Sequence, residues 1–116
     1  MKNIQSIVPL LPAQQFMLTA SLKKSSDIYV QQLVFKINKY SWEEINVAIK
    51  KLVDSYQLLR SIILYEGLKQ AVWVCSETTY PSILKHRCDI ENFNEFYNTF
   101  RKQGFSFDKE PCIRFD

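Results

Sequence analysis

The sequence predicts a layered α/β (α+β) fold with about three helices packed on a mainly antiparallel sheet. Two observations predict this fold class. Stretches with apolar residues at every third or fourth position, which form helices, alternate with short β-branched stretches, which form strands. In addition, the clearest helix passes within a few residues into a strand-like run, with Arg60 at the corner. We therefore expect the chain to be organised around residues 41–63.

The central helix is predicted over the first half of this stretch. Ser41 and Glu44 have the spacing of a capping box, in which each side chain satisfies the other residue's free backbone N–H. Over residues 54–60 the helical pattern is lost, and residues 61–65 begin a β-branched run. The predicted helix buries one apolar stripe, which comprises Trp42, Ile45, Ile49, Leu52, Val53 and Tyr56.

An earlier helix is predicted from Pro12 to about Leu22. Proline is suited to the first helical position, because its missing N–H would have no partner there. Residues 7–10 before it are compatible with an extended chain, and residues 23–27 form a polar turn. The apolar face predicted for this helix comprises Ala13, Phe16, Met17 and Ala20.

Strands are predicted on both sides of the central helix. Residues 28–37 alternate between two faces, which is typical of a half-buried strand. Residues 61–66 and 69–75 read as a hairpin around Gly67 and Leu68, with Trp73 as a core aromatic rather than a ligand-stacking one. Residues 82–88 are predicted to form a short strand that carries His86.

A last helix is predicted from Ile90 to about Gln103, with Asp89 as its cap and Gly104 ending it in the left-handed conformation. After a loop over residues 106–111, residues 112–115 begin another strand. The aromatic stripe of the helix is of the kind that packs on a sheet, and it comprises Phe93, Phe96, Tyr97 and Phe100.

Composition excludes several classes of protein. With 116 residues, 47% apolar and 23% charged, the chain is too apolar to be largely disordered. The net charge of +3 comes from scattered residues, which argues against nucleic-acid binding. No apolar run approaches the roughly 20 residues of a membrane span, and no signal peptide is visible. We therefore expect a cytoplasmic protein.

Cysteine and histidine are too few and too scattered for a metal site. Cys75, Cys88 and Cys112 have no CxxC spacing and are expected to be buried, reduced thiols. The single histidine, His86, stands between two basic residues, and acid–base catalysis would require a second group to orient it. We expect His86 to be a surface or strand residue without a catalytic role.

The helix-to-strand corner resembles a known motif. The run DSYQLLRSII is similar to the second motif of the condensation domains of nonribosomal peptide synthetases, RHExLRTxF preceded by Asp. Asp54, Leu59 and Arg60 match this motif, and Ser61 stands for its threonine. Residues 55–57 replace its Arg-His-Glu.

Two further stretches resemble motifs of the same family, in the same order and spacing. VPLLPAQQFML is similar to SxAQxRL/MW through Ala13, Gln14 and Met17, with Leu11 in place of the serine. FSFDKEPCIRF is similar to FDLxxxPLxR through Phe107, Asp108, Pro111 and Arg114.

The resemblance implies that residues 1–116 are the first part of a condensation domain's N-terminal lobe, with a fold like that of chloramphenicol acetyltransferase. The catalytic motif HHxxxDG is not in this sequence, so no catalytic residue is assigned and the chain is expected to be inactive alone. In a whole domain, two lobes enclose a tunnel. Carrier domains bring acyl groups there on phosphopantetheine arms, and an amine attacks a thioester to form the amide of a peptide product.

The matched residues are expected to have structural roles. The family places Gln14 near the core of the lobe. It also pairs the arginine of the second motif with the aspartate of HHxxxDG, which this sequence lacks. Arg60 is therefore expected to be solvated or to pair with Asp54, Asp108 or Asp116, since a buried guanidinium needs a partner.

Three functions remain open at this point. The chain is the N-terminal part of a condensation domain, or a non-catalytic module derived from one, or a fragment of a coenzyme A-dependent acyltransferase. The expected partners are carrier domains and the rest of the condensation domain, with no cofactor bound directly. Missing strands would leave a sheet edge and apolar surface uncovered, which predicts a dimer by strand exchange or covering by another chain.

Overall fold

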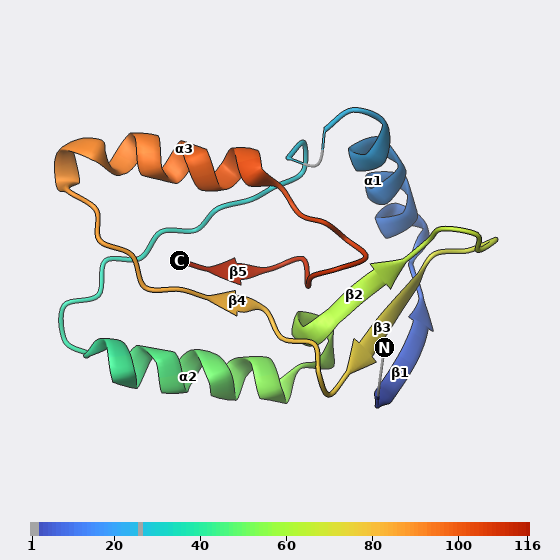
Figure 1. Cartoon of the computed structure of the whole chain (residues 1–116), viewed down its shortest axis with the longest axis horizontal. Helices are drawn as coiled ribbons and strands as arrows, with labels where there is room; N and C mark the ends of the chain where they lie inside the picture. The colour runs from blue at the N-terminus through green and yellow to red at the C-terminus, as the bar shows by residue number, and fades with distance from the viewer. Residues whose placement is uncertain (1–2, 26) are drawn as a thin grey trace.

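The computed structural model describes residues 3–25 and 27–116, and these residues confirm the predicted mixture of helices and sheet (Figure 1). A three-stranded antiparallel sheet and a two-stranded parallel pair are combined with three α-helices. The elements in chain order are β1 (Ile4–Pro9), α1 (Pro12–Lys23), α2 (Trp42–Ser55), the 3-10 helix η1 (Gln57–Arg60), β2 (Ser61–Leu64), β3 (Val72–Ser76), β4 (Ser82–Ile83), the 3-10 helix η2 (Ile90–Asn92), α3 (Phe93–Gln103) and β5 (Arg114–Phe115).

The three-stranded sheet has the order β1-β3-β2. The predicted hairpin is confirmed, with Ile63 opposite Trp73, but its loop is longer than expected and runs from residue 65 to residue 71. Gly67 in this loop has a φ of 71°, which glycine adopts without steric cost. The N-terminal segment, which had little sequence pattern, is a true strand that pairs with β3 on its other edge.

The core lies where α1 meets this sheet. Leu10, Leu18, Ile63 and Ala71 are buried together there. Trp73 packs against them, together with Tyr65 and Phe107, so its predicted role as a core aromatic is confirmed. Figure 1 shows α1 and the three-stranded sheet at one end of the molecule, while α2 and α3 flank β4 and β5 at the other.

The apolar face predicted for α1 is wrong. Phe16 is 67% exposed and Met17 is 42% exposed, whereas Leu18 and Ser21 are buried. The stripe that faces the sheet instead contains Gln14, Leu18 and Ser21, which follow one another at helical spacing. The physical reason is the hydrogen bond between Gln14 and Trp73, which fixes the rotation of the helix about its axis.

The strand predicted over residues 28–37 is also wrong. The chain turns at residues 27–29 and then runs on to α2 without strand pairing among the described residues. Alternation predicts an extended backbone with two different faces, but a strand also needs a neighbour that accepts its ladder hydrogen bonds. The polar turn expected at residues 23–27 includes Ser26, which lies outside the described residues.

Helix α2 follows the prediction closely. The Ser41 Oγ accepts the Glu44 N–H at 3.2 Å, as a capping residue does. The second half of the predicted capping box is replaced, because the Ser41 hydroxyl donates to the Glu44 carboxylate at 3.3 Å instead. Val53 on the predicted stripe is fully buried, while Leu52 and Tyr56 are exposed. No described helix is both long and apolar enough to cross a membrane.

The last helix is preceded by the 3-10 turn η2, and Asp89 makes no side-chain capping bond, contrary to prediction. Gly104 does end the helix with a positive φ of 56°, but its ψ of −153° lies outside the left-handed helical region. The predicted strand at residues 82–88 is reduced to Ser82–Ile83, which pairs with β5 in parallel.

Replacing Gly104 by alanine is expected to destabilise the fold. Its φ and ψ lie near a backbone region that is open essentially to glycine, so a Cβ there costs about 1–3 kcal/mol. Urea unfolding followed by circular dichroism measures this loss. Lys102→Ala, at an exposed position of the same helix, is the control and should change the free energy of unfolding much less. Equal stability of Gly104→Ala and the unsubstituted chain would contradict the prediction.

Candidate functional site

The three matched motifs come together around strand β2. In the first motif, Gln14 Oε1 accepts two hydrogen bonds, from the Leu11 N–H at 2.8 Å and from the Trp73 indole N–H at 3.1 Å. Trp73 lies opposite Ile63 in the sheet. In the third motif, the Phe107 carbonyl accepts the Ile63 N–H at 2.7 Å. Motifs far apart in sequence are therefore held on β2, the strand in which the second motif ends.

Arg60 holds the corner between α2 and β2. Its Nε donates to the Val53 carbonyl at 3.2 Å and its Nη1 donates to Gln5 Oε1 at 2.9 Å. The Val53 carbonyl also accepts the Tyr56 N–H at 3.4 Å. A cation near the carbonyl end of a helix is favourable, because it complements the helix dipole. Gln5 Oε1 also accepts the Cys75 thiol at 3.3 Å. The corner is thus tied to both β1 and β3.

The expected acidic partners of Arg60 are not its partners in the structure. Among the described residues the one ion pair joins His86 to Asp116, and Asp54 and Asp108 form none. Asp54 instead accepts the Tyr80 hydroxyl at 3.4 Å, and this hydroxyl lies 3.1 Å from the Lys50 carbonyl. Desolvation and the neighbouring Asp54 raise the pKa of Tyr80, so it stays a neutral donor at physiological pH.

The remaining matched residues are divided between the core and the surface. Pro111 is buried and Leu59 is half-buried, whereas Ala13 and Met17 are exposed. Asp108 is half-buried. Desolvation is the main cause of the raised pKa of Tyr65, and the negative charge of Asp108 raises this pKa further. The matched motifs thus contribute residues to both the interior and the surface of the molecule.

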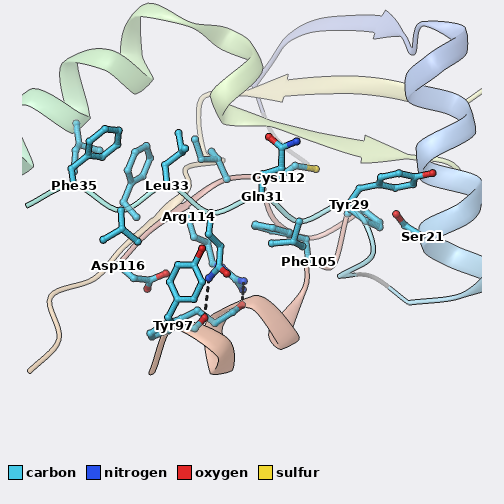
Figure 2. Close-up of a pocket in the computed structure, with 18 of the residues that line it drawn as sticks. Ser21, Tyr29, Gln31, Leu33, Phe35, Tyr97, Phe105, Cys112, Arg114 and Asp116 are labelled. Atoms are coloured by element: carbon cyan, nitrogen blue, oxygen red, sulfur yellow. Dashed lines mark hydrogen bonds between the residues drawn. The ribbon is translucent and has the colours of Figure 1, made fainter. Parts of the chain in front are cut away.

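Arg114, the last matched residue, links β5 to α3. Its Nη2 donates to the Phe100 carbonyl at 3.2 Å, and its guanidinium lies 4.4 Å from the centre of the Phe105 ring. Cation–π contacts of this kind favour arginine over lysine. Figure 2 shows Arg114 beside Tyr97 and Phe105.

A large apolar cavity adjoins this junction. It has a volume of about 830 Å³ and is lined by α1, the 29–37 segment, α2, α3 and the stretch that leads into β5. Its walls carry aromatic side chains such as Trp42, Phe93 and Phe107. Figure 2 shows Leu33 and Phe35 on the side of α2, and Tyr97 on the side of α3. The aromatic stripe of α3 therefore faces a cavity, where the sequence predicted packing on a sheet.

His86 has partners that the sequence did not reveal. Its Nε2 lies 3.0 Å from Asp116 Oδ1, and the side chain of His86 is 28% exposed. Its ring centre lies 5.4 Å from that of Phe96 and 5.0 Å from that of Phe100. Asp116 is thirty positions away, and no spacing rule joins a lone histidine to such a residue. His86 thus contacts Asp116, the residue after β5, through its Nε2, and contacts α3 through its ring.

The three cysteines differ in exposure. Cys75 is buried as predicted, but Cys88 and Cys112 are exposed, and all three are free. Cys112 lines the cavity, where desolvation by the surrounding protein and then the charge of Glu110 raise the pKa of its thiol to about 11. In the described part of the chain, no group of three His, Cys, Asp or Glu side chains could hold a metal ion.

The chain is similar to a short region of two linear gramicidin synthase subunits of Brevibacillus parabrevis. It is 26% identical to one of these subunits over 121 residues, which covers 97% of this chain. It is 28% identical to the other over 119 residues, which covers 96% of this chain. The chain spans 2% of the length of each relative. No family model matches the chain, and no solved structure does.

Gln14→Leu is expected to lower the free energy of unfolding. Leucine keeps the bulk but leaves the Trp73 indole N–H and the Leu11 N–H without their acceptor, which costs about 1–3 kcal/mol. Urea unfolding followed by tryptophan fluorescence measures this loss. The matched control is Gln15→Leu, because Gln15 Oε1 is buried without a hydrogen-bond partner among the described residues and its removal should cost little. Equal losses in the two variants would contradict the anchoring role of Gln14.

The thiol of Cys112 is expected to react slowly with iodoacetamide at neutral pH. The thiolate is the reactive form, and a pKa of about 11 keeps Cys112 protonated until the solution becomes strongly alkaline. Mass spectrometry of modified peptides should therefore show its rate rising with pH to about pH 11. Cys75 should stay unmodified while the chain is folded. A Cys112 rate that levels off near the usual thiol pKa of about 8.5 would contradict the prediction.

Proposed function

We propose that this chain is the N-terminal part of a condensation domain, which joins carrier-bound acyl and aminoacyl groups into an amide in nonribosomal peptide biosynthesis. In this proposal the chain builds the first part of one lobe and supplies no catalytic residue. The catalytic histidines belong to a HHxxxDG motif in the remainder of the domain. The domain serves the synthesis of peptide products such as antibiotics.

The observation that carries the proposal is the convergence of the three matched motifs. Short apolar motifs recur by chance, but chance would not bring Gln14, Ile63 and Phe107 into one connected hydrogen-bonded and packed unit. The similarity to the two linear gramicidin synthase subunits supports the same proposal, because it runs along nearly the whole chain.

In this proposal Arg60 binds a carboxylate of the remainder of the domain in addition to its partners within the chain. Its Nε and Nη1 are engaged within the chain, while Nη2 forms no hydrogen bond to a described residue. A guanidinium carries five N–H donors, so it can hold the corner and still bind a carboxylate. We assign that carboxylate to the aspartate of HHxxxDG in the remainder of the domain.

The cavity is the surface that the remainder of the domain covers in this proposal. Its lining is aromatic and aliphatic, and Leu33 and Phe35 in that lining are strongly exposed. Contiguous exposed apolar surface on a protein usually marks an interaction site. Donor and acceptor carrier domains are the proposed partners of the complete domain. Their phosphopantetheine arms carry the substrates, and the chain binds no cofactor itself.

The test is reconstitution of the domain from two pieces. The chain is mixed with loaded carrier domains and with the remainder of a condensation domain, taken from the linear gramicidin synthase subunit to which it is 28% identical. We expect the pieces to bind and amide product to appear, which mass spectrometry detects. Neither piece should form product alone, since the chain lacks the histidine pair and the remainder lacks this part of the lobe.

Arg60→Met supplies the matched variant. It keeps the length of the side chain but removes every N–H donor, so amide formation in the mixture should fall at least about tenfold, the effect of losing one buried charge-assisted bond. Lys69→Met, in the exposed hairpin loop, is the control. Binding of the two pieces without any product would favour a non-catalytic module, and absence of binding would overturn the proposal.

A further inference from the structure

Residues 31–38 run between the first turn and α2 with an unpaired backbone. The Val30 N–H donates to the Asp27 carbonyl at 3.1 Å, and the next bonded backbone group is the Ser41 carbonyl, which accepts the Ile45 N–H at 3.0 Å. Between them, no backbone N–H or carbonyl has a hydrogen bond to another described residue. Open N–H and carbonyl groups along a strand-like sequence offer ladder hydrogen bonds to an added strand, as the exposed edge of a sheet does.

The same segment carries some of the most exposed apolar side chains of the molecule. Leu33 is 82% exposed and Phe35 is 74% exposed, although they lie on one face of the alternating pattern. Val34 on the other face is 58% exposed. The segment therefore offers hydrogen-bonding groups and apolar surface together, which is the combination that β-strand addition uses.

We infer that residues 31–37 pair with the same segment of a second copy of this chain, antiparallel about a two-fold axis at Val34. This register places Leu33 of each copy opposite Phe35 of the other, so the two most exposed side chains of the segment cover one another. Val34 meets its own counterpart on the opposite face. A two-fold axis makes every such contact occur twice, as in most homodimers.

The polar residues of the segment fit the same register. Gln32 Nε2 donates to the Tyr97 carbonyl at 2.9 Å, while Gln32 Oε1 is buried and has no hydrogen-bond partner among the described residues. In the paired segments Gln32 lies opposite Lys36 of the other copy, so this register brings no like charges face to face.

Neighbouring registers fit less well. An axis at Leu33 would place Phe35 opposite the amide of Gln31. An axis at Phe35 would place Val34 opposite the charged Lys36 instead of another valine. An axis at Lys36 would place two lysines against each other, and like charges directly opposite are destabilising. The inferred dimer concerns the chain by itself and stands independently of the proposed function. If the remainder of a condensation domain binds the cavity, it competes with the second copy.

Disulfide trapping tests the register directly. In a background with Cys88→Ser and Cys112→Ser, Val34→Cys should form a symmetric disulfide dimer under mild oxidation, because directly opposed residues have Cβ atoms close enough to bridge. Leu33→Cys alone should not cross-link, whereas a mixture of Leu33→Cys and Phe35→Cys should give the mixed dimer. Failure of Val34→Cys to cross-link, or equal cross-linking by Leu33→Cys alone, overturns the inferred register.

The molar mass in solution tests the dimer itself. Size-exclusion chromatography with light scattering should give a dimer for the unsubstituted chain and a monomer for Phe35→Lys. Ile90→Lys is the matched control, because Ile90 is 94% exposed in another part of the chain, and this variant should remain a dimer. Circular dichroism checks that each variant is folded. A monomeric unsubstituted chain, including one that instead takes up an added apolar strand peptide, overturns the inference, as does a dimer that survives Phe35→Lys.

Discussion

Strand β2 is the constraint on which the rest of the structure depends. One of its edges pairs with β3, and the amide of Ile63 donates to the Phe107 carbonyl from the C-terminal stretch. Its first residue follows Arg60, which ties the strand to the end of α2 and to β1. Because buried backbone groups need partners, a shift of β2 by one residue would break all of these links together.

The sequence predicts those elements well whose determinants are local. Helix α2 follows from its apolar period and from Ser41, and the hairpin follows from two β-branched runs around Gly67. The rotation of α1 could not be predicted in this way. It depends on Gln14 reaching a tryptophan that lies 59 positions away, and apolar periodicity carries no information about such a polar anchor.

The candidate site shows the same division. The resemblance identified Gln14 and Arg60 as structural residues, but their partners, Trp73, Val53 and Gln5, come from the folded arrangement. Likewise, the alternation of residues 28–37 predicts a strand that the structure lacks. A strand needs a partner that accepts its ladder hydrogen bonds, and that partner belongs to another segment of the chain. The His86–Asp116 pair could not be foreseen for the same reason.

The position of β3 between β1 and β2 has a consequence for folding during synthesis. Strand β1 is translated well before β3, the strand it pairs with, so it must wait in an unpaired state until Ser76 has been made. The hairpin partner of β2 is close in sequence and can form at once when β3 appears. Pausing of the ribosome between β1 and β3 would therefore prolong the life of an apolar, unpaired strand. A chaperone that binds nascent chains would meet this protein at that stage.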